Sequence, residues 1–353
     1  MPPNQPDTPW WHPTRHVDRA PLLRGRGRVQ QTLRTWFGAQ GFTEVTISAL
    51  QVSPGNEAHL HGFATMMQGE TGAQSQMYLH TSPEFAMKKL LAAGERQINC
   101  FAQVYRNGER GVLHHPEFTM LEWYRSGADY TQLMSDCAAI LRLAVLATGA
   151  KVLQFRGLEC DPLAPIERLS LTEAFDRYTG IDLAATLDEN GQGNGQALRQ
   201  AMQKAGLSAG AEHDWATLFS QILVGQIEPN LGIGAPTALD RYPACEAALA
   251  RRCPDDQRFS ERFELYACSV ELANGFGELT DPAEQRLRFE AEMAEKQRLY
   301  GETYPLDEDF LTALALMPDA SGIALGFDRL VMLATGAPRI DDVIWAPVAL
   351  PAP

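Results

Sequence analysis

The chain has 353 residues, a formal net charge of −14 at pH 7 and a hydrophobic fraction of 45%, which fit a globular protein of one large domain or two modest ones. No run of about eighteen apolar residues indicates a membrane span, and no basic run marks a nucleic-acid surface. A basic protein partner suits the charge better. Six cysteines lie scattered without a Cys-X-X-Cys pair, which argues against a zinc knuckle and favours a reducing cytoplasm.

The first part of the chain predicts an arm, a helix and a strand. Residues 1–20 are rich in Pro and His and lack the apolar segment of a secretory signal, so a disordered arm is expected. Apolar residues at helical spacing cover 22–40, and 42–47 follows as a strand. Another helix is expected over 83–94, opened by Pro83.

The stretch 98–125 predicts two strands joined by a polar loop. The first strand ends near Arg106, the loop holds His114 and His115, and the second strand places Phe118, Met120, Glu122 and Tyr124 on one face. A guanidinium beside a basic loop suits a polyphosphate, because it can bind two phosphate oxygens. A glutamate and a tyrosine on one face suit an ammonium group. The two histidines lack a third ligand at suitable spacing, so phosphate contact or plain exposure fits them better than a metal.

The remaining elements complete an α+β pattern, with antiparallel strands flanked by helices. In order they are a helix (130–146), a mainly helical segment (156–230), two strands around a turn (259–276), a charged helix (282–301), and a strand, Gly turn and helix (321–333).

Two glutamates, Glu264 and Glu271, predict a possible metal site. They stand seven positions apart, and a turn at 268–269 would bring them together across a hairpin. Two carboxylates beside phosphates suit Mg²⁺, although a solvated strand face explains the same pattern. Asn274 and Glu278 could join Glu122 and Tyr124 around a lysine-like side chain, or form an acidic loop around a helix cap.

Taken together, separated motifs resemble a class II aminoacyl-tRNA synthetase of the lysyl type. The resemblance covers about 22–348 and rests on these segments: Arg106 with His115-Pro116-Glu117-Phe118, Gly326-Phe327-Asp328-Arg329, Thr81-Ser82-Pro83-Glu84, and 271–278. The helix and strand at 22–48 occupy the place of the dimer-forming motif, so a homodimer is implied.

Only about twenty residues precede this core, where a lysyl-tRNA synthetase carries an OB-fold that binds the anticodon. The chain therefore resembles the truncated lysyl-type paralogues that modify translation elongation factor P, as does its phrase 117–125. The implied organisation is one catalytic domain over 21–350, with a helical insertion at about 156–230 and no anticodon-binding domain.

The resemblance implies a reaction and its residues. ATP with Mg²⁺ would activate lysine or (R)-β-lysine as an aminoacyl-adenylate, which is passed to a lysine side chain of elongation factor P. Arg106 and Arg329 would be catalytic, and Glu264 and Glu271 would hold the metal. The implied nucleotide contacts are Arg106, Asn107, Gly108, Glu109, His115, Phe118, Glu271, Leu272, Gly326 and Arg329. The implied amino-acid contacts are Ser82, Pro83, Glu84, Glu122, Tyr124, Asn274 and Glu278.

Four positions depart from the lysyl pattern. Gly108 replaces a glutamate, with Glu109 next to it as a substitute; Leu113 replaces an arginine, His115 an asparagine and Ser48 a proline. Three other functions stay open: a ligase for another carrier, a fragment that charges tRNA, and a non-catalytic sensor of lysine or nucleotide. The expected partners are elongation factor P and a second copy, in the cytoplasm, without a membrane; tRNA fits less well. Lysine and β-lysine share their terminal ammonium and are not distinguished.

Overall fold

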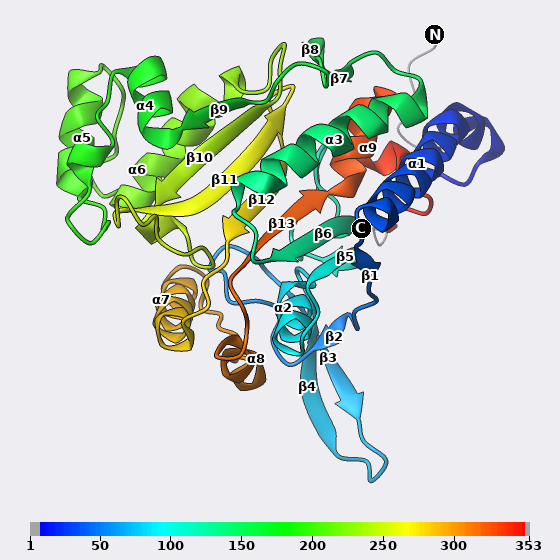
Figure 1. Cartoon of the computed structure of the whole chain (residues 1–353), viewed down its shortest axis with the longest axis horizontal. Coiled ribbons are helices and arrows are strands. Elements are labelled where there is room, and N and C mark those ends of the chain that lie inside the picture. Colours follow the sequence, from blue (N-terminus) through cyan, green and yellow to red (C-terminus); the bar gives the residue numbers. More distant parts are fainter. Residues whose placement is uncertain (1–7, 350–353) are drawn as a thin grey trace.

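An eight-stranded sheet forms the centre of the protein (Figure 1). The computed structural model describes residues 8–349. The strands follow in the order β1 (Thr43–Glu44), β5 (Gln97–Tyr105), β6 (Glu117–Ser126), β13 (Ala320–Gly326), β12 (Val270–Gly277), β11 (Phe259–Ala267), β10 (Thr237–Pro243) and β9 (Glu167–Ser170). The inner pairs are antiparallel, whereas β1–β5 and β9–β10 at the edges are parallel. The predicted α+β class is confirmed.

The two faces of the sheet pack against different sets of helices. On β6, Leu121 and Trp123 enter a core that lies under α1 (Pro13–Ala39), α3 (Thr131–Thr148) and α9 (Phe327–Thr335). Met120 and Tyr124 point to the opposite face, where they pack with residues of α2 (Glu84–Ala92) and α8 (Glu308–Leu314). Because side chains alternate along a strand, the predicted polar residues of β6 share this second face. The helices α2, α7 (Pro282–Tyr300) and α8 lie together at one end of the sheet (Figure 1).

Helix α1 begins earlier than expected. Pro13 is its first residue and the His12 side chain accepts a hydrogen bond from the Thr14 backbone N–H. Arg19 is buried and donates to the backbone carbonyls of Asp341 and Ile344. The predicted disordered arm over 1–20 is therefore wrong for residues 13–20, because partners more than 300 positions away hold this turn. Residues 1–7 lie outside the described range.

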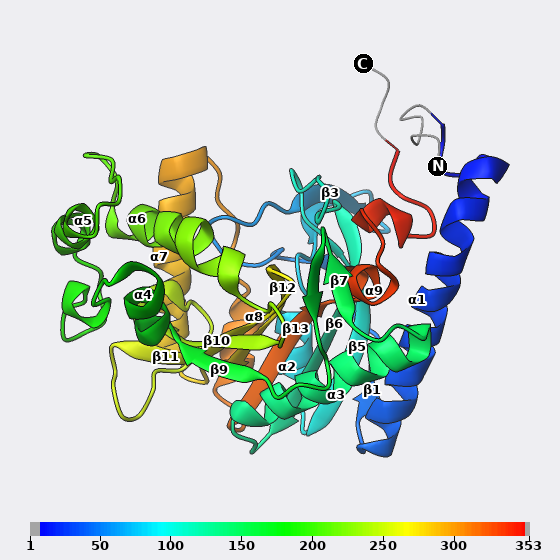
Figure 2. The ribbon, with the colours of Figure 1, turned by 90° about the horizontal axis from the view of Figure 1, so that it is seen from above.

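The segment between the strands β9 and β10 forms a separate helical lobe. It contains α4 (Leu171–Thr179), α5 (Gly195–Lys204), α6 (Trp215–Ile222) and the short turns η1 (Ala184–Thr186), η2 (Leu223–Ile227) and η3 (Glu228–Asn230). Phe175, Trp215 and Phe219 stack in its own hydrophobic core. This lobe and α1 lie at opposite ends of the molecule (Figure 2).

Three short additions complete the fold. The strands β2 (Leu50–Gln51), β3 (Phe63–Gln68) and β4 (Gln74–Leu79) form a second sheet whose hairpin projects from the body (Figure 1). The strands β7 (Leu153–Phe155) and β8 (Leu158–Cys160) pair with each other, and η4 (Ala244–Glu246) and η5 (Ile340–Asp342) are single turns. The helix α3 is long and apolar enough to cross a membrane, but it packs against α1 and α9, and its buried residues belong to the main hydrophobic core.

A buried ion pair joins helices α1 and α9. Arg26 of α1 donates to the Asp328 carboxylate at the start of α9 and to the Thr119 hydroxyl of β6. The other Asp328 oxygen accepts from the Thr119 backbone N–H at 2.7 Å. The Arg26 guanidinium also lies 4.8 Å from the centre of the Phe327 ring. These contacts hold the start of α9 against β6.

We expect Arg26→Ala to lower the free energy of unfolding by about 3 kcal/mol or more, because it leaves the Asp328 carboxylate buried without its cation. Urea unfolding followed by circular dichroism measures this. Arg34→Ala on the same helix is the matched control: its ion pair with Glu44 is partly exposed, so its loss costs less than about 1 kcal/mol. Equal losses in the two variants would contradict the role of Arg26.

Candidate active site

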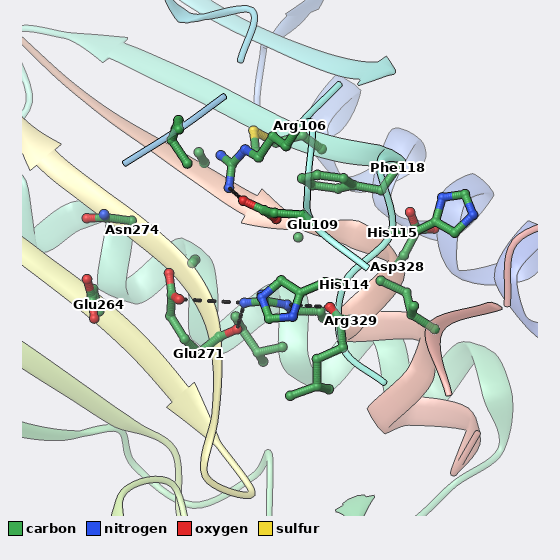
Figure 3. Close-up of a pocket in the computed structure, with 18 of the residues that line it drawn as sticks. Arg106, Glu109, His114, His115, Phe118, Glu264, Glu271, Asn274, Asp328 and Arg329 are labelled. Carbon is green, nitrogen blue, oxygen red and sulfur yellow. Dashed lines mark hydrogen bonds and ion pairs between the residues drawn. The ribbon is translucent and has the colours of Figure 1, made fainter. Parts of the chain in front are cut away.

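One wall of the site is the hairpin of β5 and β6. The Arg106 backbone N–H donates to the Pro116 carbonyl at 2.9 Å and closes the base of the connecting loop. The Arg106 Nε lies 3.3 Å from the Thr81 carbonyl oxygen, and the guanidinium stands 5.4 Å from the centre of the Phe118 ring. Its Nη1 is 3.9 Å from a carboxylate oxygen of Glu109. Arg106 and Phe118 thus face one cavity together (Figure 3).

Arg329, at the start of α9, forms the centre of the opposite wall. Its Nη1 donates to the Glu271 carbonyl at 2.8 Å and lies 3.5 Å from the Glu271 carboxylate. Its Nε donates to the Leu113 carbonyl and its Nη2 lies 2.9 Å from His114 Nε2. Arg329 therefore ties the hairpin loop to β12 across the cavity (Figure 3). Burial and the Arg329 charge lower the pKa of His114, so this ring is a neutral acceptor.

The cavity between these walls has a volume of about 350 Å³. Nine of the predicted nucleotide or metal residues border it: Arg106, Glu109, His115, Phe118, Glu264, Glu271, Leu272, Gly326 and Arg329. Asn274, a predicted amino-acid contact, borders it too. Asn107 and Gly108 lie at the start of the loop, where the Asn107 backbone N–H donates to the His61 carbonyl at 2.7 Å.

Two of the departures from the lysyl pattern now have a structural account. Gly108 has φ +81°, a left-handed conformation that favours glycine over glutamate. Glu109 follows it beside Arg106, as a substitute for the missing glutamate would. His115 borders the cavity, and its nucleotide contact stays a prediction. The ring is buried, and its Nδ1 lies 2.5 Å from the Glu117 carbonyl. Its Nε2 accepts from the Val348 backbone N–H, so it anchors the C-terminal segment and is turned away from Arg106 (Figure 3).

The predicted hairpin of Glu264 and Glu271 is confirmed. Cys268 and Ser269 form its turn with φ of 55° and 56°, and β11 and β12 pair antiparallel. A register shift after Leu265 sets Glu271 opposite Tyr266, and so on the same face as Glu264. Without this bulge, the two carboxylates would have pointed to opposite faces.

The two carboxylates fit a magnesium ion held partly by phosphate. Arg262 and the Tyr266 hydroxyl each donate to Glu264 at 2.7 Å. Burial and then the Glu264 charge raise the pKa of Glu271, so a nearby cation would stabilise its ionised form. Among residues 8–349, no group of three or more His, Cys, Asp or Glu side chains could hold a metal alone. Mg²⁺ commonly takes one or two carboxylates and completes its shell with phosphate oxygens and water.

An acidic socket lies beside this cavity, formed by Ser82, Glu84, Glu122, Tyr124 and Glu278. Ser82 Oγ and the Tyr124 hydroxyl donate to the two oxygens of Glu122 at 2.5 and 3.0 Å. Burial and the Glu84 charge raise the pKa of Glu122 to about 8. Burial also raises the pKa of Glu278 to about 7, although Lys88 acts in the opposite direction. Pro83 lies between Ser82 and Glu84 as the N-cap of α2.

The sequence reasoning missed Lys88. Its buried Nζ lies 2.5 Å from a Glu84 oxygen and 2.6 Å from a Glu278 oxygen. Burial alone lowers the pKa of Lys88, but Glu278 and Glu84 outweigh burial and keep the ammonium charged. Lys88 thus pairs with two of the three carboxyl groups of the socket, Glu84 and Glu278, and Glu122 accepts from hydroxyl groups, which leaves room for an ammonium ligand. The i,i+4 spacing of Glu84 and Lys88 was visible in the sequence, whereas the contact with Glu278 was not.

A family model for class II tRNA synthetases (D, K and N) matches residues 11–349. The chain belongs to this family. This class II synthetase is 39% identical to the elongation factor P–(R)-β-lysine ligase of Proteus mirabilis, over 96% of this chain and 97% of the relative. The enzymes of the same name from Klebsiella pneumoniae and Haemophilus influenzae are 38% and 39% identical, over at least 95% of each chain.

Gly322 on β13 is packed against the socket. A Cβ atom there would overlap with the Tyr124 ring and with Glu278 Oε1. We expect Gly322→Ala to cost about 1–3 kcal/mol of stability, because the buried ring and carboxylate must move. Chemical denaturation measures the loss. Gly27→Ala is the control, since Gly27 is helical and has open space around it; this variant should gain up to about 1 kcal/mol. No loss in Gly322→Ala would show that the socket is loosely packed.

Proposed function

We propose that this class II synthetase uses ATP and Mg²⁺ to activate (R)-β-lysine, or lysine, and transfers the aminoacyl group to a lysine side chain of elongation factor P. We place it in the cytoplasm as a homodimer that does not require tRNA. The named activity of the relatives supports this reaction. So does the geometry of the site, which joins a cavity with two arginines to an acidic socket.

One observation carries the proposal: two consecutive residues, Thr81 and Ser82, contact the cavity arginine and the acidic socket, respectively. The Thr81 carbonyl lies 3.3 Å from Arg106 Nε, and the Ser82 hydroxyl donates to Glu122. The guanidinium that would bind phosphate and the carboxylate that would bind an amine are therefore supported by neighbouring residues. A substrate with an ammonium in the socket would place its carboxylate toward Arg106, where adenylation must occur.

In the first step, the amino-acid carboxylate attacks the α-phosphate of ATP and pyrophosphate leaves. Arg106 would stabilise the charge that develops on the α-phosphate. Arg329 and Phe118 would hold the adenine between a cation and a ring. Glu264 and Glu271 would hold Mg²⁺, which neutralises phosphate charge. No covalent enzyme intermediate is needed, because the adenylate itself is activated.

The socket selects the amino acid. Glu278 and Tyr124 would bind the side-chain ammonium, with support from Glu122 and Asn274. Ser82 and Glu84 would contact the second amine of the substrate, the one near the reacting carboxylate. This amine is bonded to the second carbon in lysine and to the third carbon in β-lysine. The relatives' name favours β-lysine as the physiological substrate.

The reaction is tested by pyrophosphate exchange into ATP and by transfer of label. We expect exchange that requires Mg²⁺ and either amino acid, with (R)-β-lysine preferred. Incubation with labelled amino acid, ATP, elongation factor P and tRNA should then label the protein acceptor. Label on tRNA alone would favour a charging enzyme, and ligand binding without exchange would favour a sensor.

We expect Glu278→Gln to raise the KM for the amino acid at least tenfold at pH 8, about 1.4 kcal/mol, with the KM for ATP changed less than about twofold.

In the unmodified enzyme, the KM for the amino acid should rise as pH falls from 8 to 6. The raised pKa values of Glu278, about 7, and Glu122, about 8, mean that both carboxyl groups gain protons over this range and lose their attraction for an ammonium. Exchange assays at several pH values measure both effects. Parallel rises in both KM values would indicate a purely structural Glu278.

A further inference from the structure

A second cavity meets the nucleotide cavity at one carboxyl group. This second cavity has a volume of about 610 Å³ and lies between the loop 54–62, α7 and the turn η4. Its lining includes the exposed residues His59 and Asp214, so it reaches the surface. Four residues border both cavities: Glu57, Leu60, Arg262 and Asn274. Glu57 is the only carboxylate among these four.

The backbone around Glu57 is held from both sides. The Ala58 N–H donates to the Glu292 carboxylate of α7 at 2.8 Å. Lys296 of α7 donates to the carbonyls of Ala58 and Leu60 at 3.0 and 2.7 Å. On the other side, the His61 carbonyl accepts from Asn107 in the hairpin loop. The loop therefore spans the gap between α7 and the nucleotide cavity and fixes the place of Glu57.

The Glu57 carboxylate has a charged environment but no direct partner. Within residues 8–349, its side chain makes no hydrogen bond or ion pair, unlike Glu264 and Glu84. Burial raises the pKa of Glu57 to about 7. Four charged groups act on it from the surrounding elements: Arg106 and Arg262 lower this pKa, whereas Glu84 and Glu292 raise it. A carboxylate in this state can accept a proton at neutral pH.

Transfer to a lysine side chain needs such an acceptor, because the arriving amine is an ammonium ion and cannot attack. We propose that Glu57 is the general base of the transfer step and that the second cavity admits the acceptor lysine. This inference rests on the proposed function. The acceptor ammonium gives one proton to the Glu57 carboxylate. The neutral amine attacks the adenylate carbonyl, a C–N bond forms, and the C–O bond to phosphate breaks to release AMP. The second proton on nitrogen leaves to the departing phosphate or to water.

Other acidic residues of the site fit this role less well. Glu264 and Glu271 face the proposed metal, and Glu84 and Glu278 share the Lys88 ammonium. Glu246 borders the second cavity but not the first. Of these carboxyl groups, Glu57 is the one that borders both cavities, and it pairs with no cation among residues 8–349.

The test separates the two steps with one variant, Glu57→Gln. Enzyme carrying the preformed adenylate is mixed with elongation factor P in a single turnover at pH 7. We expect transfer to slow by about 100-fold, the usual contribution of a general base, while pyrophosphate exchange changes far less. Hydroxylamine is largely uncharged at this pH and needs no base, so its reaction with the bound adenylate should keep nearly its normal rate.

The pH profile and two further variants complete the test. In the unmodified enzyme, transfer to elongation factor P should fall as pH drops below about 7, and Glu57→Gln should lose this inflection. Glu57→Asp keeps a carboxylate and should restore part of the rate. The matched control is Glu290→Gln on the same helix as Glu292, where the side chain is exposed and its ion pair with Arg286 is long, at 3.9 Å; transfer should stay normal.

Three results would overturn the inference: unchanged transfer in Glu57→Gln, an equal loss with elongation factor P and hydroxylamine, or an unchanged pH inflection. An equal loss would mean that Glu57 positions the adenylate and does not accept the proton. Absence of exchange in the unmodified enzyme is a different outcome, because it would refute the proposed function and the inference with it.

Discussion

The site depends on a shortage of positive charge among buried carboxylates on one face of the sheet. Glu122 and Glu278 are almost fully buried, and burial raises the pKa of each, as it does for Glu271. A buried carboxylate is costly unless a cation or hydrogen-bond donors compensate it. Lys88 supplies one such cation. The positive charge that is still missing would come from an ammonium ligand and a magnesium ion. Binding of these ligands should therefore also stabilise the fold.

The opposite face of the sheet keeps these carboxylates in place. Leu121 and Trp123 alternate with Glu122 along β6 and enter the core under α1, α3 and α9. Arg26 and Asp328 then join α1 to α9 and to the backbone of β6. The next residue after Asp328 is Arg329, so the ion pair that holds the helices together also sets the direction of a proposed catalytic arginine. Loss of the ion pair between Arg26 and Asp328 should therefore also displace Arg329 in the nucleotide cavity.

The sequence predicted the features that depend on local pattern. The alternation along β6, the turn at 268–269 and the start of α2 follow from short-range rules, and the structure has all three. The predictions failed where distant partners decide. Helix α1 starts at Pro13, where Arg19 donates to carbonyls near the other end of the chain. The contact of the His115 ring with Val348 likewise joins distant residues and has no sequence pattern. Neither Lys88 nor Glu57 has a motif, because their surroundings form only when segments far apart in the sequence meet.

The reaction that we propose must treat two amines in opposite ways. The amine at the end of the amino-acid side chain has to stay charged to be recognised, whereas the acceptor amine has to lose its proton to react. The same kind of group, a carboxylate, can do both if its surroundings differ. Around Glu278, a resident lysine and the Tyr124 ring form a closed socket in which an ion pair is favoured. Among residues 8–349 no cation contacts the Glu57 carboxylate, and it borders a cavity that reaches the surface, so a proton can be taken up there and passed on.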